Sequence, residues 1–270
     1  MARKTKGIES RFVDLTELDS PQPMTFWGRP GTGKTTLSAT APKPIFYIDV
    51  KDRGTESAKT KGLKKGDVVV FTIEDFDDIM GAYDYLSENS GDFKTVVIDH
   101  MGALQELAYS QVMVKNNKSR MSQQLYGFAS DLMKEVIDLY KSLGDEGILP
   151  IFLAQDRTRG GDDGDGEQLD PEVGPALQPS VAKYLMAASR VVGQTYIAEE
   201  VDKTTTPGKV KSSIQYRLRL GPHPYYQTKV TKPLDADMPD YLVNPNISQV
   251  LEIIKGEYSK PATKRRRRKK

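Results

Sequence analysis

The nonapeptide GRPGTGKTT, residues 28–36, constrains the fold of this 270-residue chain more than any other segment. Its spacing, Gly28-x-x-x-x-Gly33-Lys34-Thr35, is the complete P-loop pattern. The glycines allow successive backbone N–H groups to converge on phosphate oxygens, and the N-terminus of a following helix adds partial positive charge. An apolar run precedes the motif and small residues follow it, so the sequence predicts a strand–loop–helix unit that binds the phosphates of ATP.

The motif assigns roles to particular side chains. Lys34 is expected to reach the β- and γ-phosphates, and the Thr35 hydroxyl to coordinate Mg²⁺. A P-loop enzyme also needs an acid at the end of a hydrophobic strand to hold the metal, and TVVIDH supplies Asp99; the alternative role of Asp99 is to cap the next helix. The expected nucleotide-binding residues of the loop are Gly28, Arg29, Pro30, Gly31, Thr32, Gly33, Lys34, Thr35 and Thr36.

Hydrolysis of ATP requires a group that aligns the attacking water. The segment IDVKDRGTE follows the second expected strand and contains three acids, Asp49, Asp52 and Glu56. Asp52 lies just beyond the strand end, so we favour Asp52 as the catalytic carboxylate.

Composition excludes several other classes of protein. Apolar residues make up 37% and charged residues 28%, as in soluble globular proteins, and no window is apolar enough to span a membrane. The basic start has no apolar core behind it, so we expect no secretory signal. The absence of cysteine excludes disulfides, thiolate metal sites and cysteine nucleophiles. The net charge is only +2, yet residues 264–270 are all basic and form a tail that either contacts phosphates or aids solubility.

The order of apolar segments predicts an α/β fold. Expected strands alternate with helical patterns, which indicates parallel βαβ units, and the segments after residue 190 read as antiparallel hairpins that extend the sheet. We expect an N-terminal arm (1–20), one ATPase domain (21–258) and a basic tail (259–270). The expected strands are 23–28, 43–50, 66–73, 93–104 and 147–155, and the expected helices begin at 33 and span 74–88, 120–143 and 247–258.

Four segments, in this order, resemble the RecA-like recombination ATPases, in particular the short single-domain forms of bacteriophages that are grouped with single-strand-annealing proteins. FWGRPGTGKTTL resembles the phosphate loop of that family, FYIDVKDRGT the strand that carries its catalytic glutamate, and TVVIDHMGAL its metal-binding strand. The segment from Ser119 to Arg159 is similar to the helix and strand that end in a γ-phosphate-sensing glutamine, here Gln155. The alternative for Gln155 is a cap or turn residue.

The resemblance also places two loops where the family binds DNA. The first, residues 113–122, contains Lys115, Lys118 and Arg120, which suit phosphate contacts. The second follows Gln155 and departs from the family because it is acidic, which argues against direct DNA contact there. Its charged residues are Arg157, Arg159, Asp162, Asp163, Asp165, Glu167, Asp170 and Glu172; the run DDGDGE lacks the full spacing of a calcium loop.

Two further departures concern catalysis. Lys51 stands where the catalytic glutamate of the family would be, and alignment on RGT brings Asp52 into that place with one residue inserted. YYQTKVTKP resembles the strand that reaches the nucleotide of a neighbouring subunit. In it Gln227 replaces the first lysine, Lys229 matches the second, and Lys232 is available to compensate.

The resemblance implies an ATP- and Mg²⁺-dependent recombination or single-strand-annealing protein. Its implied partners are single-stranded DNA, further copies of itself in a ring or filament, and a single-strand-binding protein. No association with a membrane is implied. The implied location is the cytoplasm, that of the host for a phage-encoded chain. Two alternatives stay open: a nucleotide-switched assembly or loading protein with little DNA affinity, and a P-loop kinase of small molecules.

Overall fold

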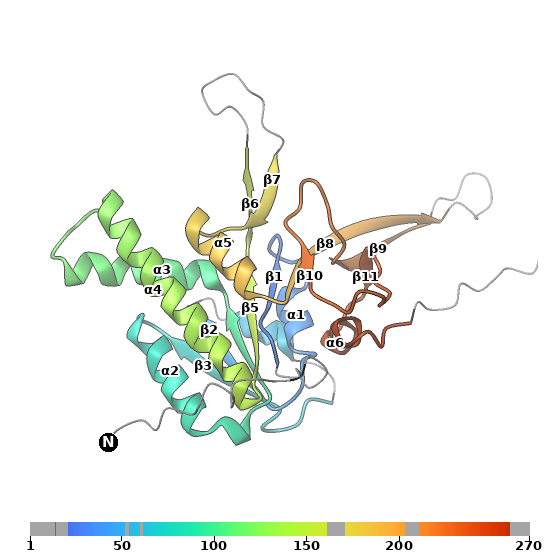
Figure 1. The fold of residues 1–270 in the computed structure, drawn as a ribbon, viewed down its shortest axis with the longest axis horizontal. Helices are drawn as coiled ribbons and strands as arrows, with labels where there is room; N and C mark the ends of the chain where they lie inside the picture. The colour runs from blue at the N-terminus through green and yellow to red at the C-terminus, as the bar shows by residue number, and fades with distance from the viewer. Residues whose placement is uncertain are drawn as a thin grey trace, which may run out of the picture.

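The computed structural model describes residue 14 and residues 21–51, 54–59, 62–160, 171–202 and 211–259. In these ranges a nine-stranded sheet forms the centre of the molecule, with helices on both faces (Figure 1). Its strands are β1 (Met24–Trp27), β2 (Ile45–Val50), β3 (Val68–Ile73), β4 (Thr95–Asp99), β5 (Leu149–Ala154), β8 (Val191–Asp202), β9 (Lys211–Arg219), β10 (Lys229–Val230) and β11 (Tyr241–Val243). The arm (apart from Asp14), Asp52 and residues 260–270 of the basic tail lie outside the described residues.

The strand order is β11-β9-β8-β1-β5-β4-β2-β3, with β10 also paired to β8. The six strands from β8 to β3 are all parallel to their neighbours in that order. The pairs β8–β9, β9–β11 and β8–β10 are antiparallel. The predicted α/β class is confirmed, because a mostly parallel sheet is extended by C-terminal antiparallel strands.

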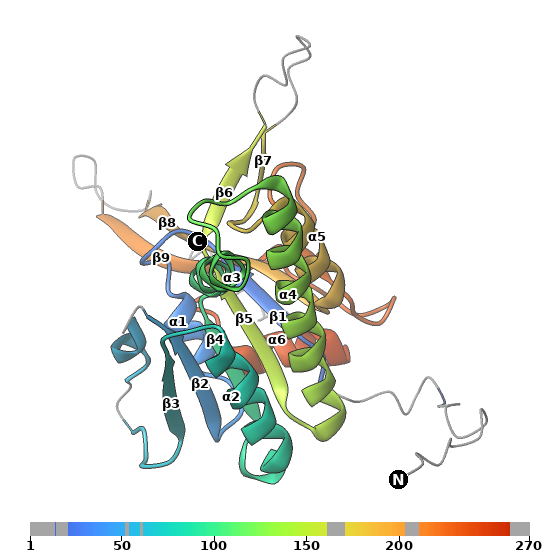
Figure 2. The same cartoon turned by 90° about the vertical axis from the view of Figure 1, so that its left-hand side faces the viewer.

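Helices cover the two faces of the sheet unequally (Figure 2). The larger buried cluster joins one face to α2, α3, α4 and α5, whereas α1 and α6 pack on the other. The helices are α1 (Lys34–Ser38), α2 (Asp77–Glu88), α3 (Met101–Lys115), α4 (Gln123–Ser142), α5 (Pro179–Ala188) and α6 (Ile247–Lys255), with 3₁₀ turns η3 (Gly54–Ala58), η4 (Ser90–Asp92) and η5 (Leu143–Glu146). In the described part of the chain, no helix has the length and apolar character needed to cross a bilayer.

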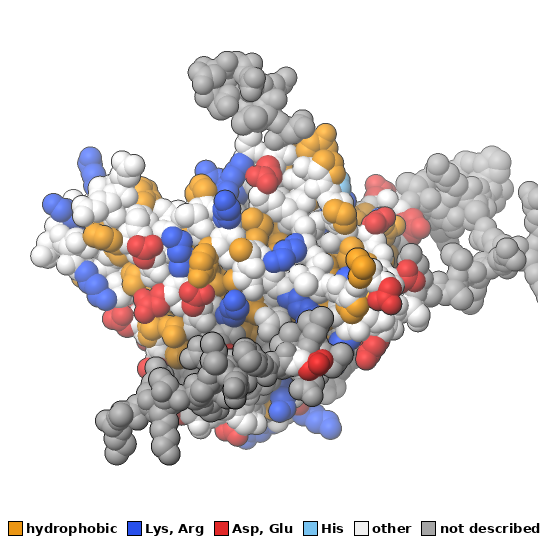
Figure 3. All heavy atoms as spheres, viewed as in Figure 1, with side chains coloured by type: hydrophobic (Ala, Val, Ile, Leu, Met, Phe, Trp, Pro, Cys, Tyr) orange, Lys and Arg blue, Asp and Glu red, His pale blue; other side chains and the backbone are white. Residues whose placement is uncertain are grey.

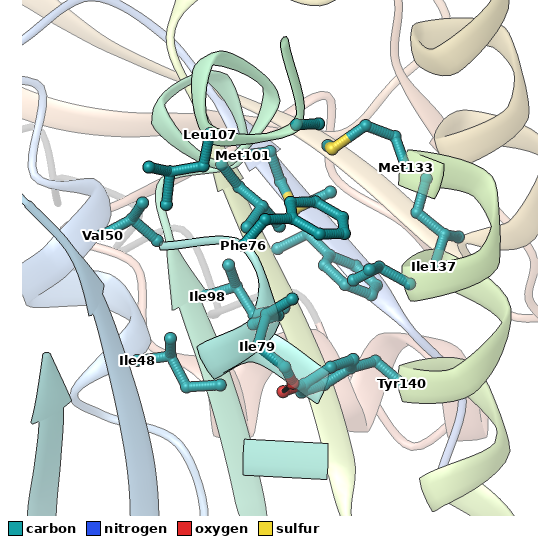
Figure 4. Close-up of a cluster of buried hydrophobic side chains, with 14 of the residues drawn as sticks. Ile48, Val50, Phe76, Ile79, Ile98, Met101, Leu107, Met133, Ile137 and Tyr140 are labelled. Atoms are coloured by element: carbon teal, nitrogen blue, oxygen red, sulfur yellow. Dashed lines mark hydrogen bonds between the residues drawn. The ribbon is translucent and has the colours of Figure 1, made fainter. Parts of the chain in front are cut away.

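The larger core cluster explains why the predicted helices lie where they do. Figure 4 shows Ile79 and Tyr140 directed at each other between α2 and α4, and the Tyr140 hydroxyl donates to the Ile79 carbonyl at 2.9 Å. Met133 and Ile137 lie one turn apart on α4 and are fully buried. The apolar stripes at helical spacing therefore fix which face of each helix meets the sheet.

Two segments differ from their predicted structures. Residues 93–104 were expected to contain a strand running to the aspartate, and β4 does end at Asp99, but the rest of this segment starts α3 at Met101, because His100 caps the helix: its Nδ1 accepts the Ala103 N–H at 3.2 Å. The segment after Gln155, expected as a long loop, begins and ends in a two-stranded ribbon, β6 (Asp156–Arg159) and β7 (Glu172–Pro175). This ribbon projects from the body in both views (Figures 1 and 2), and residues 161–170 lie outside the described part.

Candidate nucleotide-binding site

The phosphate loop joins β1 to α1, as predicted. Gly28 donates its N–H to the Ala154 carbonyl at 3.3 Å, so the loop starts beside the carboxyl end of β5. A Cβ at Gly28 would lie 2.2 Å from the Thr195 carbonyl oxygen, and Gly31 and Gly33 have φ values of 79° and 88°. These positions therefore require glycine for close approach and for left-handed backbone.

Lys34 folds back over this loop. Its Nζ donates to the Gly28 carbonyl at 2.7 Å and to the Arg29 carbonyl at 2.9 Å. Burial lowers the pKa of Lys34, and the nearby carboxylates of Asp99 and Asp156 partly offset this. Phosphate oxygens would stabilise the same ammonium more strongly than neutral carbonyls do, so the geometry fits a nucleotide phosphate at this point.

Thr35 and Asp99 meet as the motif predicts. The Thr35 hydroxyl donates to Asp99 Oδ2 at 2.8 Å, and the Tyr47 hydroxyl donates to the same oxygen at 2.7 Å. Burial, and next the charge of Asp99, raise the pKa of Tyr47 far above its usual range, so the phenol stays a donor. Tyr47 was not singled out from the sequence, because an aromatic residue in a buried strand gives no signal of such a role.

This donor set fits Mg²⁺ bound together with a nucleotide. Among the described residues, no group of three acidic, histidine or cysteine side chains is placed to hold a metal alone. Mg²⁺ commonly uses one or two carboxylates, while phosphate oxygens and waters complete its coordination. Asp99 and Thr35 supply the carboxylate and the hydroxyl, and a nucleotide held in the phosphate loop beside them would supply the phosphate oxygens.

Of the three acids in IDVKDRGTE, the two that the structure describes, Asp49 and Glu56, have different surroundings. Asp49 is 3% exposed and lies level with Asp99 on the neighbouring strand, and the Thr55 hydroxyl donates to its Oδ2 at 3.3 Å. Glu56 is exposed and pairs with Lys59 on the surface. Asp52, the predicted catalytic carboxylate, lies outside the described residues, and its role stays a prediction.

Gln155 lies at the carboxyl end of β5, where sites in parallel sheets form. Its Nε2 is 3.5 Å from Nε2 of His100, the residue that follows Asp99. The next residue, Asp156, places its Oδ2 3.7 Å from Nε of Arg29 in the phosphate loop. The predicted sensor and the phosphate loop are therefore neighbours.

A cavity of about 460 Å³ opens beside the phosphate loop, within the size range of small-molecule sites. Besides residues 31–37 it is lined by Ser57, Thr195, Tyr216, Asn244 and Pro245. Tyr216 belongs to β9 and Asn244 follows β11, so the C-terminal antiparallel strands complete the wall. Nothing local in the sequence marks these residues, because only the strand order brings them to the loop.

We expect the base of the nucleotide to contact Tyr216, since this ring is 45% exposed and faces the cavity next to Gly33. Stacking of a base on an aromatic ring contributes about 1–3 kcal/mol. Tyr216→Ala should therefore raise KM for ATP by about tenfold and leave kcat nearly unchanged, measured by steady-state hydrolysis. Tyr225→Ala, an exposed tyrosine outside the cavity, is the matched control; equal KM values for both variants would contradict this placement.

Lys229, predicted to reach a neighbouring subunit's nucleotide, has partners within its own chain. Its Nζ donates to the carbonyls of Met186 and Ala187, both at 3.1 Å, at the end of α5. In the sheet Lys229 pairs with Val192. Val192 in turn pairs with Thr25, which stands three residues before Gly28. Lys229 therefore does not join the site of its own chain, and its role toward a neighbour stays a prediction.

A match to a family model identifies the family of this chain. The model of the AAA domain family matches residues 20–231, from just before β1 through β10. A solved structure of a KaiC-like protein from the hyperthermophilic archaeon Pyrococcus horikoshii is 12% identical, with a TM-score of 0.45, over 83% of this chain and 89% of that one. A comparison with curated proteins found no match. Because the family match covers most of the chain and includes the phosphate loop and Asp99, the protein belongs to the AAA domain family of P-loop ATPases.

Proposed function

We propose that this protein is a Mg²⁺-dependent ATPase whose bound nucleotide controls its affinity for single-stranded DNA. It acts in recombination or strand annealing, as a ring or filament of identical copies. The observation that carries the proposal is the direct connection between the nucleotide site and β6. Asp156 contacts Arg29 of the phosphate loop, and the next residue on the same strand, Arg157, is exposed on the projecting ribbon.

The residues of the site have complementary roles in hydrolysis. Lys34 would neutralise charge on the β- and γ-phosphates, and Thr35 and Asp99 would hold Mg²⁺, which when bound would supply stabilisation of negative charge on the phosphates. Tyr47 orients the Asp99 carboxylate through its 2.7 Å hydrogen bond. The Asp52 carboxylate aligns the attacking water, and the amide of Gln155 senses whether the γ-phosphate is present.

A basic surface lies next to these groups. Lys115, Lys118 and Arg120 are exposed at the end of α3 and in the loop before α4, and Figure 3 shows basic side chains over this tip. Burial, Glu106 and Tyr126 raise the pKa of Tyr109 on α3 to about 12, and the charge of Arg157 partly offsets this rise.

Aromatic rings at the same place suit unpaired bases. Tyr109 and Tyr126 meet edge to face with ring centroids 5.4 Å apart, and Tyr126 is 42% exposed. Exposed rings beside basic residues are the usual means of binding single strands without sequence preference. We therefore assign the single-stranded DNA site to the α3–α4 tip and the base of the β6–β7 ribbon.

Hydrolysis assays with and without single-stranded DNA test this proposal. We expect the strand to stimulate the wild-type ATPase, and ATP to strengthen a salt-sensitive gel shift. The double variant Lys118→Glu/Arg120→Glu should weaken DNA binding at least about tenfold and retain basal hydrolysis, because these residues lie outside the ATP cavity.

The matched control is Lys94→Glu, an exposed lysine just before β4, at the amino end of the sheet. Hydrolysis indifferent to DNA, together with no ATP-dependent shift at low salt, would contradict the proposal. That outcome would favour a nucleotide-switched assembly or loading protein with little DNA affinity. The net charge of only +2, which attracts DNA weakly, is consistent with that alternative.

A further inference from the structure

The strand β3 ends the sheet on the side opposite the C-terminal hairpins. Among the described residues, only β2 pairs with it, and no other described strand lies beyond it. Figure 2 shows β3 as the outermost strand on its side of the sheet. The nucleotide cavity has no lining residue from β3, so this edge is separate from the ATP site.

The outer edge of β3 offers backbone groups for pairing. The Ile45 N–H of β2 donates to the Asp67 carbonyl at 2.9 Å, and Ile45 is level with Val68. Because a parallel ladder uses alternate residues, Val68, Val70 and Thr72 direct their N–H and C=O groups away from β2.

The side chains of this edge are unusually apolar. Val69 is 41%, Val70 47% and Phe71 37% exposed, on both faces of the strand. Phe71 also packs against Phe46, with ring centroids 6.0 Å apart. Natural edge strands usually carry lysine, proline or a bulge that prevents pairing, and VVVFTI has none of these.

The charges at the ends of β3 have opposite signs. Lys64 and Lys65 precede the strand and are exposed, and Glu74 and Asp75 follow it and are exposed. Asp67, between the two groups, is already paired with Lys43 at 3.1 Å. Parallel pairing of two such strands would bring like charges together, whereas antiparallel pairing brings the basic end of each strand to the acidic end of the other.

We propose that β3 pairs antiparallel with β3 of a second copy, about a two-fold axis at Val70. In this register Val68 pairs with the partner's Thr72, so all the outward backbone groups of the three outward residues are satisfied. Val69 then lies opposite the partner's Phe71, a combination of β-branched and aromatic residues that stabilises sheets. The two sheets become one continuous sheet with an isologous interface.

A single cysteine tests both the pairing and its register, because the natural chain has none. Val70→Cys places two thiols opposite each other across the axis, and Cα atoms about 5.5 Å apart in such a pair suit a disulfide. Thr72→Cys is the matched control, since its two copies would lie about 13 Å apart. Under mild oxidation without nucleotide, the Val70→Cys chain should form at least about ten times more disulfide-linked dimer than the Thr72→Cys chain.

Sedimentation of the full chain tests the charge argument. Lys65→Glu and Glu74→Lys should each raise the dimer dissociation constant several-fold, and the double variant should restore it. In the absence of nucleotide, Val70→Lys, which places two like charges on the axis, should abolish the β3-paired dimer, and the variant should still bind ATP. Monomers of the wild type at tens of micromolar, equal crosslinking of the two cysteine variants, or dimers unaffected by Val70→Lys would each overturn the proposal. Crosslinking that appears only after removal of residues 1–20 would also overturn it, since the arm would then be the occupant.

Discussion

Replacing Lys34 with alanine is expected to reduce kcat for ATP hydrolysis by about 10²–10³-fold and leave the fold intact. Loss of one preorganised donor to a transition-state anion has effects of this size. The two carbonyls that Lys34 contacts line an open loop, where water can replace the ammonium, and alanine is the best helix former at the start of α1.

The measurement is steady-state hydrolysis, with thermal unfolding of each variant as the check on folding. Lys94→Ala, which removes an exposed lysine at the amino end of the sheet, is the control and should hydrolyse ATP at the wild-type rate. A Lys34→Ala chain that retains more than about a tenth of wild-type turnover would show that hydrolysis happens elsewhere.

Replacing Asp99 with asparagine is expected to have the second large effect. The amide oxygen can still accept from Thr35 and Tyr47, so the local structure is kept, but a neutral amide is a poor Mg²⁺ ligand. We expect turnover at saturating ATP to fall by about 10²-fold and the Mg²⁺ concentration for half-maximal turnover to rise. A titration of Mg²⁺ at fixed ATP measures both quantities.

Tyr47→Phe distinguishes the structural role of Asp99, as a hydrogen-bond acceptor, from its role as a Mg²⁺ ligand. It removes one hydrogen bond to Asp99 and keeps the charge, so it should lower the free energy of unfolding by about 1–3 kcal/mol and leave most of the turnover. If Asp99→Asn and Tyr47→Phe had the same Mg²⁺ dependence, Asp99 would be a structural residue rather than a metal ligand.

The phosphate site could be predicted because its information is local. Eight consecutive residues, 28–35, set the loop, and the β-branched run before Asp99 places that acid at a strand end. The sequence did not reveal that Asp49 lies beside Asp99, because this depends on the register of β2 and β4, which are separated by more than forty residues. The wall formed by Tyr216 and Asn244 depends in the same way on the pairing of β8 with both β1 and β9.

The differences between the predicted and the observed structure have local physical causes. The start of α3 at Met101 was not predicted because its cap, His100, is an uncommon capping residue that gives no recognised start signal. The ribbon β6–β7 was missed because its strands are short and mostly polar, without the apolar alternation that marks a half-buried strand. The within-chain partners of Lys229 are backbone carbonyls of α5, which no side-chain pattern can indicate.

Calorimetric titration of the full chain with a non-hydrolysable ATP analogue in the presence of Mg²⁺ tests the central claim most directly, because it measures binding without turnover. We predict one saturable site per chain in the wild type, with affinity reduced at least tenfold in Lys34→Ala and unchanged in Lys94→Ala. No saturable heat with the wild type, or the same affinity in all three chains, would contradict the assignment of the ATP site to the loop between β1 and α1.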